Sequence, residues 1–291
     1  MKGPRIMKSR LFSAAILIIL TAALIFFCNV PLVLNFFVAI LSAAALYEVL
    51  IVTKYVESKA LTSISMFFAF IIPFISEISH LVEPLGLHFE LGNAWFVLIF
   101  VYAVILFSTL LLSYKTYNLE HLSVVFLMSV VIPCFLSTIV FAHRLTGDRW
   151  NIVLIILCSW AADSGGFIFG KLFGRHKLTP KISPKKTVEG AVGAVFATIG
   201  ATVIFAYCVD VFISSITVNY VALVIYAFIG SFCAMFGDLV ASLIKRSFGV
   251  KDFGKLIPGH GGIMDRFDSV LFVAPFLYIA MTMCPVFIDK F

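Results

Sequence analysis

Charged residues are scarce in this 291-residue chain: they make up 12% of it, against about 25% in a typical soluble domain. Hydrophobic residues make up 62%, and the mean hydropathy is +1.11. A water-soluble core could not bury this many apolar side chains, which include 32 Phe. The composition excludes soluble, disordered and disulfide-stabilised secreted proteins. It indicates a protein that lives in a lipid bilayer.

The sequence also lacks zinc-binding motifs, internal repeats and low-complexity tracts. None of the six Cys residues forms a CxxC or Cys–His motif, and the six His residues are scattered. We interpret the cysteines as small buried side chains and expect no zinc site. The net charge is +6. In a membrane protein an excess of Lys and Arg mostly marks the loops that face the cytoplasm, so we expect no nucleic-acid partner.

Long apolar runs fill most of the chain. Crossing the hydrocarbon core takes a helix of about 20 residues. By this criterion we expect an all-α polytopic membrane protein with about nine transmembrane helices. The runs lie approximately at 11–28, 30–53, 62–79, 94–113, 121–141, 150–170, 188–214, 219–244 and 267–288. The first run follows a basic segment but is too long for a signal peptide and lacks a cleavage site, so we interpret it as an uncleaved span.

The basic residues predict an orientation. If the amino terminus is cytoplasmic, only Arg144, Arg149 and Lys290 of the 21 Lys and Arg residues fall outside, in agreement with the positive-inside rule. Nine spans then place the carboxyl terminus outside. A short basic start favours a bacterial cytoplasmic (inner) membrane over an organelle.

The two halves of the sequence differ in kind. Residues 1–145 are about five spans joined by short, plain loops, whereas residues 146–291 hold about four spans and two long, basic inside loops, 171–187 and 245–266. We therefore expect the chemistry in the second half, in a polar cavity that faces the cytoplasm.

Carboxylates interrupt two of the apolar runs. Asp163 and Asp238 each stand within a predicted span, where a charge costs at least a few kcal/mol and is retained mostly for function. The alternative is a structural carboxylate bonded to a nearby serine or backbone group. Asp265 and Asp268 share a helix face at the start of the last run. Several converging carboxylates need a cation, and hard oxygen ligands suit Mg²⁺.

Phosphate-binding features flank these carboxylates. Lys185, Lys186 and Thr187 precede a predicted helix, whose amino end attracts anions. Gly261 and Gly262 belong to a Gly-rich turn that a phosphate can approach closely. Each signal alone is weak, but together they predict a metal-dependent phosphate-handling site.

The assembled motifs resemble the phosphatidate cytidylyltransferase, or CDP-diacylglycerol synthase, family. The resemblance lies in the unbroken run from Ser242 through Lys245, Arg246 and His260 to Asp268, and in a second block from Asp163 to Thr187. Two positions depart from the family pattern, which has a Tyr near Phe167 and a Trp in place of Val188. Neither departure changes a charged residue, so we expect altered packing around the nucleotide.

The resemblance implies an Mg²⁺-dependent reaction of CTP with phosphatidic acid that gives CDP-diacylglycerol and pyrophosphate. It implies a two-cation site with K⁺ beside Mg²⁺, and a homodimer. By match to the family motif, Asp238 and Asp265 would be the principal metal ligands, with Asp268 and Asp163 completing the cluster. The same match assigns the phosphates to a set of cationic and polar residues: Lys185, Lys186, Thr187, Ser242, Lys245, Arg246, His260, Gly261, Gly262 and Arg266. Of these, Lys245, Arg246 and His260 would act, with Asp238 and Asp265, as catalytic residues.

Two other functions remain open from the sequence. A CTP-dependent polyprenol or lipid kinase, or another CTP-using lipid enzyme such as a synthase acting on ether lipids, would share the nucleotide site. A kinase would transfer the γ-phosphate. An ion-coupled transporter would use Asp163 and Asp238 as a relay, but transporters commonly show repeated halves, and this sequence has no visible repeat.

Overall fold

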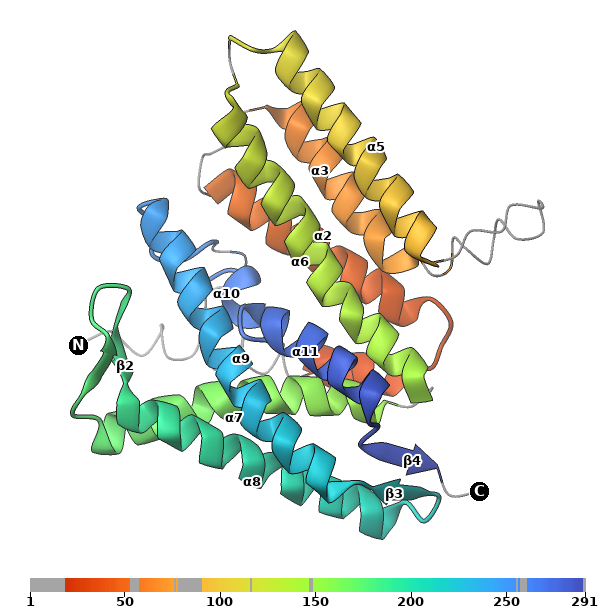
Figure 1. Ribbon diagram of the computed structural model, residues 1–291, viewed down its shortest axis with the longest axis vertical. Coiled ribbons are helices and arrows are strands. Elements are labelled where there is room, and N and C mark those ends of the chain that lie inside the picture. The colour runs from red at the N-terminus through yellow and green to blue at the C-terminus, as the bar shows by residue number, and fades with distance from the viewer. Residues whose placement is uncertain are drawn as a thin grey trace.

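The computed structural model describes residues 19–52, 58–75, 77, 91–115, 117–146, 149–254, 256 and 261–289 (Figure 1). Most of this part of the chain is helical. The helices are α2 (Val33–Val52), α3 (Lys59–Ile71), α5 (Leu91–Leu112), α6 (Leu119–Thr146), α7 (Trp150–Phe173), α8 (Val188–Phe212), α9 (Tyr220–Ser247), α10 (Met264–Phe267) and α11 (Val270–Met283), with a 3₁₀ turn at Ile72–Phe74. The strands are β1 (Lys177–Thr179), β2 (Ser183–Thr187), β3 (Ile216–Val218) and β4 (Phe287–Asp289).

The prediction of an all-α polytopic membrane protein is confirmed. In the described ranges, six helices are long and apolar enough to cross a membrane: α2, α5, α6, α7, α8 and α9. The third and ninth predicted spans form shorter apolar helices, Lys59–Phe74 and Val270–Met283. Residues 11–18 of the first predicted span, 11–28, lie outside the described residues, and residues 19–27 of it are helical. The count of nine spans stays a prediction.

In the first half, α3 and α6 pack against α2, and α5 packs against α6. Phe68 on α3 stacks on Tyr102 of α5 with ring centroids 4.0 Å apart, and the Tyr102 hydroxyl lies 2.8 Å from Ser65 Oγ. Only 11% of the membrane-spanning stretch of α5 is buried within the protein. Helix α5 therefore lies at the edge of the bundle, where its apolar side chains can face lipid (Figure 1).

Helices α7 and α8 form a tightly packed pair in the second half. Glycines let their backbones approach: a methyl group at Gly193 on α8 would overlap the ring of Phe169 on α7, and one at Gly165 would overlap Ala197. Close approach through small residues is typical of helix pairs in membranes, where hydrophobic exclusion does not drive association. Both helices contribute lining residues to the pocket described below.

We expect Gly193→Ala to separate α7 from α8, because Phe169 cannot yield without a shift of its helix. Overpacking of this kind lowers the free energy of unfolding by about 1–3 kcal/mol. The matched control is Gly200→Ala on the same helix, where an added methyl group meets no atom within 4 Å. Thermal unfolding in detergent should show a lower unfolding midpoint for Gly193→Ala and no decrease for Gly200→Ala. Equal midpoints would contradict this account of the pair.

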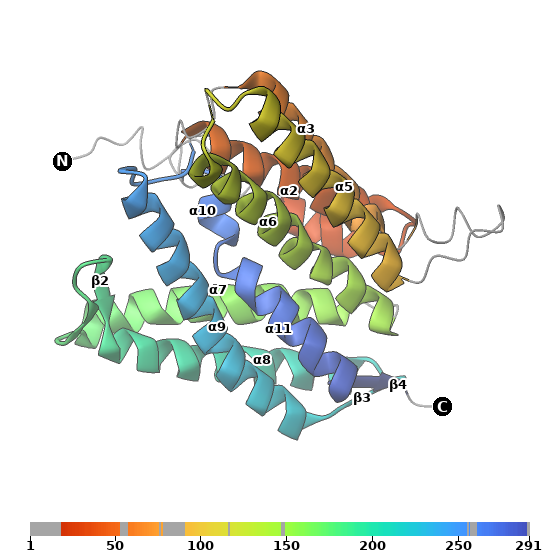
Figure 2. The ribbon, with the colours of Figure 1, turned by 45° about the horizontal axis from the view of Figure 1, so that its top comes forward.

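The last two helices bring the halves of the chain together. Helix α11 packs against α6 and α9, while the single turn of α10 contacts α2 (Figure 2). The loop before α10 thereby meets a helix from the first half of the sequence. A residue of the first half can therefore act on this loop, although the sequence predicted chemistry only in the second half.

Two predicted boundaries are corrected by the structure. The ninth predicted span reaches 288, but α11 ends at Met283, and Cys284 is extended with φ −148° and ψ 104°. The cause is Pro285, which has no N–H to continue a helix and disfavours helical geometry in the residue before it. The chain continues into β4, which pairs antiparallel with β3 through Thr217 and Ile288.

The predicted loop 171–187 is also more regular than expected. Helix α7 continues to Phe173, and β1 then pairs antiparallel with β2, matching Lys177 to Thr187 and Thr179 to Ser183. This hairpin directs the chain from the end of α7 into the start of α8. Its second strand carries Lys185 and Lys186, so the hairpin sets where these lysines lie.

Candidate active site

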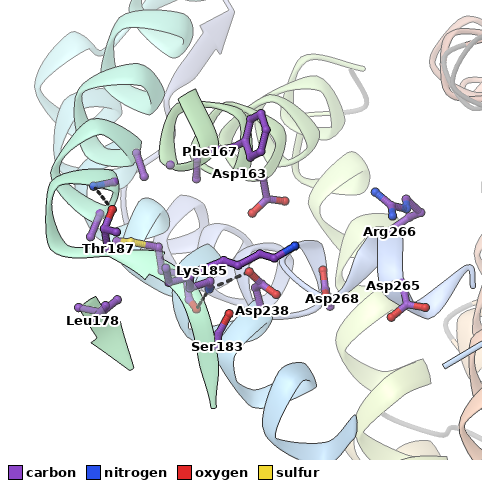
Figure 3. A pocket seen from close by; sticks show the side chains of 17 residues that line it. Asp163, Phe167, Leu178, Ser183, Lys185, Thr187, Asp238, Asp265, Arg266 and Asp268 are labelled. Atoms are coloured by element: carbon purple, nitrogen blue, oxygen red, sulfur yellow. Dashed lines mark hydrogen bonds and ion pairs between the residues drawn. The ribbon is translucent and has the colours of Figure 1, made fainter. Parts of the chain in front are cut away.

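A pocket of about 350 Å³ lies among α7, the β1–β2 hairpin, the start of α8, α9 and the segment around α10 (Figure 3). Its lining residues come from both predicted motif blocks. They are Ala162, Asp163, Gly166, Phe167, Leu178, Ser183, Lys185, Lys186, Thr187, Gly190, Ala191, Ala194, Met235, Asp238, Asp265, Arg266 and Asp268. The fold thus brings together segments that are separated by about a hundred residues in the sequence.

Three carboxylates from three elements point into this pocket: Asp163 from α7, Asp238 from α9 and Asp268 from the turn between α10 and α11 (Figure 3). Asp163 accepts a hydrogen bond of 2.8 Å from the hydroxyl of Ser269. Asp268 is only 7% exposed. Three neighbouring carboxylates cannot all stay ionised at low cost unless positive charge lies between them.

Cationic side chains line the same pocket. Lys186 Nζ lies 2.7 Å from Asp238 Oδ2 and donates a 3.2 Å hydrogen bond to the carbonyl of Met235. Lys185 and Arg266 are exposed lining residues. The combination of cations and carboxylates suits a ligand that is itself anionic and brings a metal ion with it.

Thr187 has a local structural role at the pocket wall. Its hydroxyl caps α8 by accepting the N–H of Gly190 at 3.1 Å, and its side chain is buried. The amino end of α8, which carries the partial positive charge of the helix dipole, thereby faces the pocket. The predicted phosphate contact of Thr187 is not tested by this arrangement.

Asp265 lines the pocket, but both of its oxygens have partners within the protein. Oδ1 lies 2.8 Å from Lys245 Nζ, and Oδ2 accepts the N–H groups of Phe253 and Gly262, each at 2.9 Å. The side chains of Asp265 and Lys245 are 5% and 12% exposed. In Figure 3, Asp265 points away from the other three carboxylates. As the residues stand, this ion pair fastens the loop before α10.

The other predicted site residues lie around the pocket. Ser242 Oγ is 3.5 Å from Asp238 Oδ1, so the predicted helix face is present. Arg246 is exposed in the last turn of α9. Gly261 adopts φ +89°, which favours glycine, and Gly262 follows it. Among the residues that the structure describes, none of these four lines the pocket. His260 lies outside the described residues.

One residue beside the site was missed by the sequence reasoning. Glu48 stands on α2, in the first half of the chain, and is only 1% exposed. Its carboxylate accepts the N–H of Met264, the first residue of α10. The signal was available, because Glu48 interrupts the predicted span 30–53 as Asp163 and Asp238 interrupt theirs.

The donor set is suited to Mg²⁺ although the protein does not enclose an ion by itself. In the described part of the chain, no three His, Cys, Asp or Glu side chains are grouped closely enough to hold a metal. Mg²⁺ commonly keeps several waters and binds one or two carboxylates together with substrate phosphates, so it needs no complete protein cage. Asp163, Asp238 and Asp268 offer such oxygens in one pocket.

Comparison with known proteins identifies related sequences. A model of the cytidylyltransferase family matches residues 8–284. The phosphatidate cytidylyltransferase of Staphylococcus haemolyticus (strain JCSC1435) is 39% identical over 183 residues, which are 62% of this chain and 68% of that protein. The phosphatidate cytidylyltransferase of Staphylococcus aureus (strain COL) is 37% identical over 194 residues, 65% of this chain and 72% of that protein.

Proposed function

The chain belongs to the cytidylyltransferase family, and from that membership we propose that it joins CTP to phosphatidic acid, giving CDP-diacylglycerol and pyrophosphate. One observation carries the proposal: three carboxylates, Lys185, Lys186 and Arg266 line a single pocket at the amino end of a helix. These groups are suited to binding a nucleoside triphosphate together with its cation.

The proposed reaction requires no covalent intermediate with the protein. An oxygen of the lipid phosphate attacks the α-phosphorus of CTP, the bond from that phosphorus to the bridging oxygen breaks, and pyrophosphate leaves with the electron pair. The lipid phosphate is already a good nucleophile near neutral pH, so no side-chain base is needed. The protein contributes position and charge neutralisation. Lys185, Lys186 and Arg266 bind the phosphates in this scheme.

Asp163, Asp238 and Asp268 would hold Mg²⁺ together with the triphosphate. The ion, when bound, neutralises charge on the α-phosphate and on the leaving pyrophosphate. Asp265 already accepts hydrogen bonds from Lys245 and the two loop amides, and it points away from the other three carboxylates (Figure 3). Its predicted place in the metal shell and the predicted K⁺ beside Mg²⁺ stay predictions.

The pocket also offers apolar surface for the lipid. Phe167 is 71% exposed, and Leu178 is exposed on the hairpin; both line the pocket. We place the enzyme in a bacterial cytoplasmic membrane with the amino terminus and the pocket on the cytoplasmic side, because CTP arrives from water and phosphatidic acid from the leaflet. The distribution of Lys and Arg supports this orientation, and the homodimer stays a prediction.

The test is label transfer by the purified protein in detergent with phosphatidic acid and Mg²⁺. With CTP labelled at the α-phosphate, we expect label in the lipid phase, and no transfer after chelation of the metal. Label that enters lipid only from the γ-phosphate of CTP would replace this proposal with a lipid kinase. No transfer from either position would contradict both enzymes and favour the transporter.

A further inference from the structure

Glu48 makes a long-range contact with the segment that carries the site's acidic residues. Its Oε2 accepts the backbone N–H of Met264 at 3.0 Å, across 216 positions of sequence. Met264 begins α10, Asp265 and Arg266 follow it in the same turn, and Asp268 caps the end of that turn. A hydrogen bond at this point fixes where α10 begins relative to α2.

Two glycines of the loop make room for this carboxylate. A methyl group at Gly254 would overlap Oε1, Cδ and Cγ of Glu48, and one at Gly262 would overlap its Oε2 and Cδ. Neither glycine has a positive φ, so it is close approach, rather than backbone conformation, that excludes a side chain. Gly262 leaves space for Glu48, and its predicted contact with a phosphate stays a prediction.

Glu48 and Asp265 hold the same loop from two sides. Asp265 binds the N–H groups of Phe253 and Gly262, while Glu48 binds that of Met264 and lies against Gly254. Phe253 is fully buried. Two carboxylates therefore fix both ends of the stretch 253–264, one from α10 itself and one from the first half of the chain.

We propose that Glu48 is a positioning residue for cytidylyl transfer: it sets the place of α10, and through α10 the places of Arg266 and Asp268 in the pocket. Glu48 is not among the described residues that line the pocket, so it acts through the loop. The proposal rests on the proposed function. It also explains why an ionisable residue is kept within an apolar helix, where it is costly.

The experiment compares Glu48→Gln, Glu48→Ala and Asn35→Ala. Gln keeps the size and one acceptor oxygen, whereas Ala removes the contact. Loss of groups that orient functional residues typically lowers activity or metal affinity about 10- to 100-fold. We expect turnover to fall in the order wild type, Gln, Ala, with Glu48→Ala down about 100-fold and more Mg²⁺ needed for half the maximal rate.

Asn35→Ala is the matched control because it removes a buried polar contact of the same helix elsewhere. Asn35 is 4% exposed, and its Nδ2 donates a 2.8 Å hydrogen bond to the carbonyl of Pro73. This variant should lose stability but keep turnover and Mg²⁺ dependence. A Glu48→Ala enzyme that behaves like Asn35→Ala would overturn the positioning role and leave Glu48 as a stabilising residue.

A double-mutant cycle with Gly254→Ala tests the contact itself. The single variant Gly254→Ala should lose turnover, because its methyl group displaces the Glu48 carboxylate. Glu48→Ala removes the three nearest atoms that this methyl group would meet, so the double variant should be no slower than Glu48→Ala alone. If the fold-losses in turnover of the two single variants multiply in the double variant, the proposal is contradicted.

Amide hydrogen exchange separates this inference from the proposed function. Glu48→Ala should speed exchange in peptides that cover 261–268 and leave α7 and α8 unchanged. Unchanged exchange at 261–268 overturns the inference whatever the enzyme does. A wild-type protein that transfers no label refutes the proposed function, while the exchange result still decides whether Glu48 holds the loop.

Discussion

Asp238→Asn should lower turnover by about 10²- to 10³-fold, the usual effect of removing one preorganised electrostatic group from an active site. Asp238 lines the same pocket as Asp163 and Asp268, and it pairs with Lys186 at 2.7 Å. The amide keeps the shape but removes the charge that a cation requires. The measurement is the rate of label transfer from α-labelled CTP at saturating Mg²⁺.

Folding should survive this substitution. The Lys186 and Asp238 side chains are 21% and 33% exposed, and ion pairs in contact with solvent contribute only about 0–1 kcal/mol. Asp210→Asn is the matched control, since Asp210 is a carboxylate of α8 that accepts a hydrogen bond from Tyr220. The control should keep full turnover. An Asp238→Asn enzyme as active as the control would remove Asp238 from the site.

Asp265→Asn should destabilise the protein as well as slow it. Lys245 and Asp265 are nearly buried, and removal of one partner of a buried ion pair costs about 3–5 kcal/mol because the other charge is left uncompensated. The loop before α10 also loses a charged acceptor for Phe253 and Gly262. Unfolding in detergent, followed by heat or denaturant, measures the loss.

The double variant Lys245→Met with Asp265→Asn separates charge from geometry. It leaves no unpaired charge, so its loss of stability should be smaller than the sum of the two single losses. Turnover should remain low, because the loop is still released from Asp265. Additive losses of stability would show that the two side chains do not act as a pair.

The fold followed from the sequence where the apolar pattern was long and uninterrupted. Helices α5, α7, α8 and α9 lie close to their predicted spans because length and hydropathy alone define a membrane helix. Pro285 ended α11 earlier than its hydropathy suggested. The hairpin of β1 and β2 was missed because its strands are short, basic and exposed, and carry no alternation of apolar residues.

Site residues could be predicted where burying them in an apolar helix is energetically costly. Asp163 and Asp238 were recognised because a carboxylate in an apolar helix is expensive, and the structure places both in one pocket with Asp268. Local roles were harder to see: Thr187 is a helix cap, and Gly262 makes room for a side chain. Glu48 carries the same signal as Asp163 and Asp238, but its contact with α10 could not be predicted. Its partner lies 216 positions away, and helical periodicity carries no information at that range.

The most direct test of the account is a crystal structure with a non-hydrolysable CTP analogue and Mn²⁺, which replaces Mg²⁺ and gives an anomalous signal. We expect the triphosphate of the analogue to bind in the pocket beside Lys185, Lys186 and Arg266. We expect the anomalous peak at the carboxylates of Asp163, Asp238 and Asp268. Nucleotide and metal bound elsewhere, with these three carboxylates left facing water, would contradict the account.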